Sequence, residues 1–208
     1  MTKIGISLNE VLRDYLGQLI YTYKKYINTL YLSEEEVTDL KEAEFTDFDF
    51  GTKLGFKKNQ DFLRFLFIEA ALEISGHADQ LTDGLMNHFN LFLNELREAD
   101  YDVQLVSREA SKSIPATFFF LSKTACAVDK LRFVRKDAEE WGNVDILITA
   151  NPIALANKPK DKLAIKIKSP YNTDAPADYE LDSILDIIKD VTLRNKILNT
   201  KITTFEDF

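Results

Sequence analysis

Small neutral side chains stand where three predicted strands end, and they are the residues best placed to do chemistry. The carboxyl ends of parallel strands meet at one edge of a sheet, so these side chains should share one site. A hydroxyl becomes a strong nucleophile only beside a base, and an amide has no titratable proton. Neither group supplies the anionic oxygens that Mg²⁺ prefers. The residues are Ser7 and Asn9 after the first strand, Ser107 after the second, and Thr149 and Ala150 after a later one.

Hydrophobic periodicity predicts the elements that position these residues. Short apolar runs predict strands, and apolar residues spaced three or four apart predict helices. The predicted strands are 3–8, 101–106, 131–134, 145–148 and 163–167, and the predicted helices are 15–31, 61–74, 83–96, 114–121 and 181–191. Strands that alternate with helical stretches favour a mostly parallel sheet. We expect an α/β, Rossmann-like fold in which helices flank this sheet, with an inserted helical cap and a C-terminal helical tail.

The region between the first two predicted strands is helical and apolar. Residues 61–74 are apolar on nearly every side, which predicts a helix enclosed by others. We expect the phenylalanines of 62–67, and those of 118–120 further along the chain, to lie in the core. Residues 33–49 carry eight acids and one lysine, a composition typical of an exposed connector.

In their order and spacing these features resemble the haloacid dehalogenase-like (HAD) superfamily, in particular its nucleotidase-type members with a helical cap after the first strand. In that family the first strand ends in Asp-x-Asp, a second ends in Ser or Thr, a lysine follows, and a later strand ends in paired acids. The matching positions hold Ser7 and Asn9, then Ser107, then Thr149 and Ala150. The resemblance extends over about residues 3–172. It implies a HAD-like core of residues 1–14 and 99–172, a cap of residues 15–98, and a C-terminal helix and tail of residues 173–208.

The resemblance also implies that the family's chemistry is lost. In the family the first Asp attacks phosphorus, the second serves as general acid and base, and the first and fourth motifs hold magnesium. All of these positions are neutral in this chain. We therefore predict no catalytic residue, no metal ligand and no cofactor.

Two assignments stay open at this point. Lys123, Lys130 and Lys136 all match the family's lysine. Glu10, Asp14 or Asp145 would be substitutes for the missing acids. Their places near the start of the first helix and at a strand entry favour capping roles instead.

Composition limits the classes of partner. The net charge of −8 disfavours a nucleic-acid-binding surface. No apolar run approaches the roughly 20 residues that a membrane span needs, and the N-terminus does not resemble a signal peptide. Cys126 is the only cysteine, which excludes an intrachain disulfide and fits a reducing compartment. We predict a soluble intracellular protein.

An apolar stripe near the C-terminus predicts an amphipathic helix that another surface must cover. We expect its residues, with two phenylalanines of the tail, to contact other protein subunits of a large homo- or hetero-oligomeric assembly. These interface candidates are Leu181, Ile184, Leu185, Ile188, Phe205 and Phe208.

The sequence thus predicts a catalytically inactive HAD-like protein that serves as a structural or adaptor subunit, with a bacteriophage particle as the most concrete setting. Two alternatives remain. One is an active 5′-nucleotidase-type phosphatase with relocated acids. The other is a pseudoenzyme that binds a nucleotide or phosphate through Ser107 and a lysine without turning it over.

Overall fold

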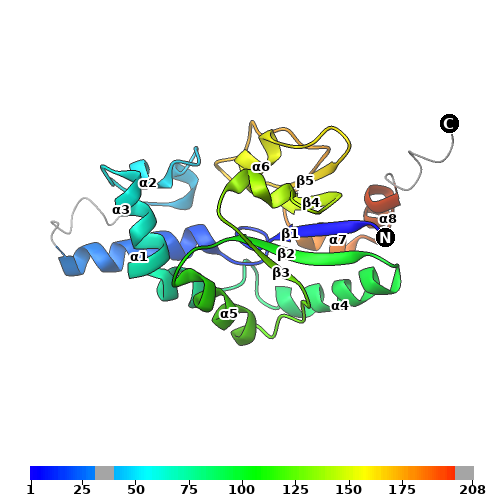
Figure 1. The fold of residues 1–208 in the computed structure, drawn as a ribbon, viewed down its shortest axis with the longest axis horizontal. Helices are drawn as coiled ribbons and strands as arrows, with labels where there is room; N and C mark the ends of the chain where they lie inside the picture. The colour runs from blue at the N-terminus through cyan, green and yellow to red at the C-terminus, as the bar shows by residue number, and fades with distance from the viewer. Residues whose placement is uncertain (31–39, 200–208) are drawn as a thin grey trace.

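A computed structural model of the chain describes residues 1–30 and 40–199. Six parallel strands form one sheet in the order β3-β2-β1-β4-β5-β6 (Figure 1). They are β1 (Lys3–Ser7), β2 (Asp102–Arg108), β3 (Leu131–Val134), β4 (Ile146–Thr149), β5 (Leu163–Ile167) and β6 (Tyr179–Leu181). The expected α/β fold with a mostly parallel sheet is confirmed. The strand order reverses direction at β1, which places a ligand-binding crevice of this fold type at the carboxyl ends of β1 and its neighbours.

Helices connect the strands and cover both faces of the sheet. The α-helices are α1 (Tyr15–Leu30), α2 (Phe50–Lys53), α3 (Asn59–Arg64), α4 (Leu85–Glu98), α5 (Ser113–Lys123), α6 (Pro152–Ala156), α7 (Ile184–Lys189) and α8 (Val191–Asn199). Two π-helical turns, η2 (Phe65–Glu69) and η3 (Leu72–Gly76), follow α3, and two short 3₁₀ helices are η1 (Glu42–Glu44) and η4 (Asp137–Trp141). No helix of the described residues is long and apolar enough to cross a membrane.

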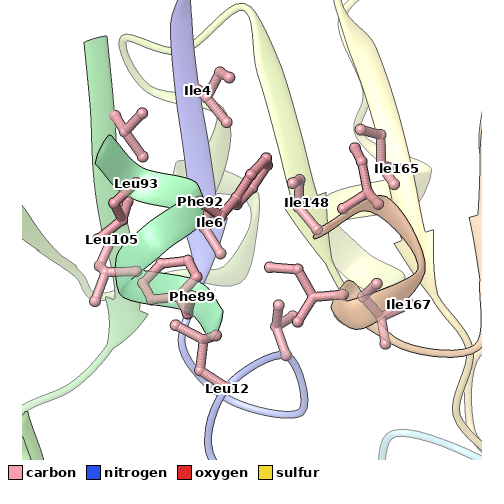
Figure 2. Packing of buried hydrophobic residues seen from close by; sticks show 14 of the residues in the cluster. Ile4, Ile6, Leu12, Phe89, Phe92, Leu93, Leu105, Ile148, Ile165 and Ile167 are labelled. Atoms are coloured by element: carbon pink, nitrogen blue, oxygen red, sulfur yellow. The ribbon is translucent and has the colours of Figure 1, made fainter. Parts of the chain in front are cut away.

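The strands are buried on both faces, as their uninterrupted apolar runs predict. One face carries isoleucines from β1, β4 and β5, including Ile6, Ile148 and Ile165, which pack against Phe89 and Phe92 of α4 (Figure 2). Helices α5, α7 and α8 extend this cluster. On the opposite face, Leu147 and Ala164 pack with Trp141 of η4 and with α6.

The helical region between β1 and β2 divides into two parts. Residues 15–30 and 40–69 form a part beyond one end of the sheet (Figure 1), which we call the insertion, and its aromatic cluster also includes Tyr171. Helix α4 lies along the strands instead, and its buried side chains belong to the sheet cluster. The predicted cap of residues 15–98 therefore includes a helix that packs as part of the α/β core.

Several residues expected in the core are exposed. In the predicted helix of residues 61–74, Ile68 is 42% exposed and Leu72 is 50% exposed, whereas Phe65 is 2% exposed. The π-turns η2 and η3 rotate successive side chains differently from an α-helix, so the apolar residues do not all turn inward. Phe118 and Phe119 are 54% and 44% exposed because α5 buries the face that carries Ala116 and Phe120.

The C-terminal stripe is covered largely by the chain itself. Leu181 lies in the short strand β6, not in a helix, and is buried. Ile184 of α7 is fully buried in the cluster that contains α4. The prediction that Leu181 and Ile184 contact other subunits is therefore corrected, because the sheet edge and α4 already cover both side chains. Leu185 and Ile188 are half-buried against the same cluster, and Phe205 and Phe208 lie outside the described residues.

Candidate functional site

A cavity of about 320 Å³ lies between the carboxyl ends of the central strands and the insertion. The strands contribute its polar side, which includes Ser7, Ser107 and Arg108. The insertion contributes a mainly aromatic side, which includes Phe48, Phe50, Phe62, Leu66 and Phe67. The cavity therefore occupies the place where the topology of the sheet predicts a ligand site.

A buried carboxyl group stands at the centre of the polar side. The Ser7 hydroxyl donates to Oε2 of Glu140 at 2.5 Å, and its oxygen lies 2.8 Å from Oγ1 of Thr149. The Thr149 hydroxyl also donates to Oε2 of Glu140, at 2.9 Å. The structure thus brings two of the predicted positions together, around an acid that the sequence analysis did not select.

Asn151 and Asp137 complete this network. The Asn151 side-chain amide donates to Oε1 of Glu140 at 2.7 Å and to Oδ1 of Asp137 at 2.8 Å. Arg108 donates to Oδ2 of Asp137 at 2.8 Å. All four carboxylate oxygens of Glu140 and Asp137 are therefore engaged by donors of the chain itself.

Glu140 is positioned by the 3₁₀ helix η4, which precedes β4 and turns its side chain toward the sheet edge. Burial raises the pKa of the Glu140 carboxyl, and the hydrogen bonds from Ser7, Asn151 and Thr149 oppose this rise in pKa. The only sequence signal for this site is the acidic stretch of residues 137–140, and it does not differ from that of an ordinary exposed loop.

Asn9, the second position of the first HAD motif, belongs to a separate network around a buried ion pair. Asn9 accepts hydrogen bonds from the Arg13 guanidinium through Oδ1, with a distance of 2.9 Å to Nε. Arg13 is fully buried, and it pairs with Glu109 at 2.5 Å. It also donates to the Ser75 carbonyl and to the Thr117 hydroxyl, each at 2.9 Å.

The remaining predicted positions lie at the same edge of the sheet. Ser107 donates to Oε1 of Glu109 at 3.0 Å, so its hydroxyl is part of the Arg13 network. Ala150 is buried, and its carbonyl accepts from the Asn172 side chain at 2.8 Å. The sequence analysis therefore located the correct edge of the sheet, but it missed Arg13, Glu109, Asp137 and Glu140.

None of the three candidate lysines lines the cavity described here. Lys123 donates to the carbonyls of His77 and Ala78, and Lys130 pairs with Asp102 at 2.5 Å. Lys136 precedes η4 and is exposed. The cationic side chain that does line the cavity is Arg108.

The candidate substitute acids have structural roles. Asp14 accepts from the Gly17 amide at 3.0 Å, and Asp145 accepts from the Lys3 amide at 2.9 Å at the opposite edge of the sheet. Oε1 of Glu10 accepts from the amides of Tyr15 and Leu16 at the start of α1. Of these three acids, only Glu10 also lines the cavity. Burial raises the pKa of Glu10 to about 7, and nearby Asp14 and Glu42 contribute to the increase.

Comparisons with solved structures agree with this architecture. A hydrolase from Pseudomonas syringae superposes with a TM-score of 0.57 at 13% identity, over 92% of this chain and 98% of that one. A HAD-like family hydrolase from Xanthomonas campestris gives a TM-score of 0.51 at 11% identity, over 98% and 99% of the two chains. The protein YfnB from Bacillus subtilis, described as a HAD-hydrolase bound to magnesium, gives 0.53 at 12% identity, over 95% and 98%.

This chain has a HAD-like fold. No protein-family model matches its sequence, and no curated protein matches it either. At these low identities the HAD-like likeness is one of fold, so the chemistry has to be argued from the side chains.

The residues at the strand ends do not fit the magnesium ion that the fold family implies. Mg²⁺ requires near-octahedral coordination and is usually held by one or two carboxylates. Here, the oxygens of Glu140 and Asp137 accept hydrogen bonds from Ser7, Thr149, Asn151 and Arg108, and the guanidinium adds a positive charge. Within residues 1–30 and 40–199, no three acidic, His or Cys side chains are grouped to hold a metal ion.

We predict that Arg13→Met lowers the free energy of unfolding by about 3–5 kcal/mol, because it leaves Glu109 buried without its partner. Urea unfolding followed by circular dichroism measures this change. Adding Glu109→Gln should restore part of the loss, since no uncompensated charge remains. Lys130→Met, which breaks an exposed ion pair, is the control and should cost less than about 1 kcal/mol. Equal losses for Arg13→Met and Lys130→Met would contradict the proposed role of the buried pair.

We also predict that Glu10→Gln changes how stability depends on pH. The folded carboxyl binds its proton more tightly than the unfolded one, so its stabilising contribution is present below pH 4.5 and is lost as the pH rises through about 7. Gln does not titrate. Between pH 4.5 and pH 8 the free energy of unfolding of the variant should therefore rise relative to that of the wild type. The difference should reach up to about 3 kcal/mol, at 1.36 kcal/mol per pKa unit. Parallel pH profiles of the two unfolding free energies would contradict the raised pKa.

Proposed function

We propose that this protein is a HAD-like domain that does not catalyse magnesium-dependent phosphoryl transfer and acts as a structural or adaptor subunit. The observation that supports the lack of phosphoryl transfer is the hydrogen-bond network around Glu140. The hydroxyls of Ser7 and Thr149 donate to its carboxylate, so groups at the two strand ends satisfy one another. A nucleophilic carboxylate and a metal-binding set are replaced by an internally hydrogen-bonded cluster.

The charges at the cavity also argue against a phosphate or nucleotide ligand. Among the described residues that line it are four carboxyl groups, those of Glu10, Asp49, Asp137 and Glu140. The single guanidinium, of Arg108, is already paired with Asp137. Ser107, expected to help bind phosphate, donates to Glu109 instead. A dianionic phosphate would meet more negative than positive charge, which disfavours binding.

Exposed apolar side chains support the adaptor role. Leu72 and Phe119 are 50% and 44% exposed, and we call them the apolar patch. Leu72 and Phe119 meet above Gly76, where an added methyl group would lie 2.8 Å from Leu72 and 3.2 Å from Phe119. Exposed apolar patches on soluble domains often mark sites of protein contact. An assembly such as a bacteriophage particle is the setting that we propose for this contact.

One observation favours a second candidate, an active hydrolase with a relocated acid. The Ser7 hydroxyl lies 2.5 Å from Glu140, as a nucleophile would from its base. Burial raises the pKa of Glu140, which makes its carboxylate a stronger base. This candidate requires turnover that depends on both residues.

We predict no turnover of p-nitrophenyl phosphate or nucleoside monophosphates by the purified protein with about 10 mM MgCl₂, a concentration that would largely fill a site whose Kd is about 1 mM or tighter. An active HAD-like phosphatase assayed in parallel is the positive control. Turnover within a few-fold of that enzyme would overturn the proposal. If such turnover is lost in both Ser7→Ala and Glu140→Gln, the second candidate is correct.

We further predict that the apolar patch touches another polypeptide. A photo-crosslinking amino acid in place of Phe119 should yield adducts with one defined protein when the chain is made in its own cell. The control position is Leu91 on α4, which is 63% exposed but lies outside the patch. Equal adducts from both positions, or none from Phe119, would contradict the adaptor role.

A further inference from the structure

Three aromatic rings form a continuous wall of the cavity. Phe48 lies with its ring centroid 5.1 Å from that of Phe50 and 5.3 Å from that of Tyr171, and Phe50 and Tyr171 are 5.1 Å apart. Phe48 and Phe50 come from the insertion, whereas Tyr171 follows β5. We call these three residues the aromatic wall. Phe62 and Phe67 line the cavity as well, so aromatic groups dominate its apolar surface.

Carboxyl groups stand beside this wall. Glu10 and Glu140 both act on the Tyr171 hydroxyl and raise its pKa, after the larger effect of burial, which places the ring in the field of both acids. Oε1 of Glu10 accepts both backbone bonds at the start of α1. Its other oxygen, Oε2, accepts no hydrogen bond from residues 1–30 or 40–199, and it is not among the fully buried atoms without a partner. Glu10 therefore lines the cavity with one oxygen that no donor of the described residues engages.

The charge of the lining is unbalanced. Among the residues that the structure describes, four carboxyl groups and one guanidinium line it, and that guanidinium is held by Asp137. Glu140 and Asp137 are satisfied by hydrogen bonds, whereas Glu10 has Asp14 and Glu42 as further acidic neighbours. A positive charge placed near Glu10 would relieve this repulsion.

We propose that the cavity binds a small organic cation, with an alkylammonium group held between the aromatic wall and Glu10. The negative faces of aromatic rings attract a cation within about 6 Å, and desolvated quaternary ammonium groups are bound in this way. A volume of about 320 Å³ suits a small ligand and lies at the lower end of the range for ligand pockets. This inference goes beyond the proposed function, which names no ligand.

The opposite ligand chemistry is disfavoured at the same place. A phosphate ester would bring negative charge against Glu10 and Glu140, with Arg108 already engaged. A neutral molecule of the same shape would gain the apolar contacts but not the attraction to the ring faces and to Glu10. Charge is therefore the property that separates the proposed ligand from its competitors.

Choline, its neutral isostere 3,3-dimethylbutan-1-ol and AMP provide the test, by titration into the full-length protein at pH 8 with calorimetry and NMR. We expect saturable binding of choline, with shifts confined to cavity residues, and affinity at least about tenfold lower for the isostere, a difference of 1.4 kcal/mol. AMP should not compete with choline. Equal binding of the isostere, tighter binding of AMP, or no saturable binding of choline would each overturn the proposal.

Two variants locate the ligand. Glu10→Gln keeps an acceptor for the α1 amides but removes the charge, and Phe48→Leu removes the ring of a half-buried residue. Each should weaken choline about tenfold while leaving the isostere within about twofold. Phe118→Leu, outside the cavity, is the matched control and should change neither. Unchanged choline affinity in both cavity variants would place the ligand elsewhere and refute the assignment. A phosphatase-active protein that still binds choline would refute the proposed function alone.

Discussion

Arg13 is fully buried, and its guanidinium bonds to nearby Asn9 and to three residues that are distant in the sequence. Asn9 follows β1, Glu109 follows β2, Thr117 lies in α5, and Ser75 lies in η3 next to the insertion. Burying a charge without partners costs several kcal/mol, so the guanidinium is tolerated only when these groups surround it together. The same contacts fix the insertion against the sheet edge, and with it both sides of the cavity.

The network around Glu140 lies at the edge of the sheet where this fold type places a ligand site. Parallel strands still deliver polar residues to one edge, but Ser7 and Thr149 donate protons where an anionic site would accept them. A single carboxyl from η4 can therefore be buried, because it receives three hydrogen bonds from side chains. Polar groups that satisfy one another stabilise a structure, and they are then less available to a metal ion or a substrate.

The aromatic side of the cavity has a different origin. Phe48 and Phe50 pack with Tyr171, so contacts within the insertion and to the loop after β5 keep the rings in place. These rings and four carboxyl groups line the same cavity among the described residues, with Arg108 as the one cationic side chain. The charge of this lining suits the cationic ligand proposed above.

The sequence by itself determined the α/β class, the strands β3 and β5, and the edge at which polar residues collect. These features depend on local apolar runs and on the residues that directly follow them. It did not show β6, because three residues are too few for a pattern, or the outward turn of Leu72, which follows from two π-turns. Only the tertiary structure decided which polar groups meet at the site. Ser7 and Glu140 are 133 residues apart, and Arg13 and Glu109 are 96 apart. A buried charge is stabilised by partners that the fold supplies from distant segments, and spacing along the chain carries no signal for them.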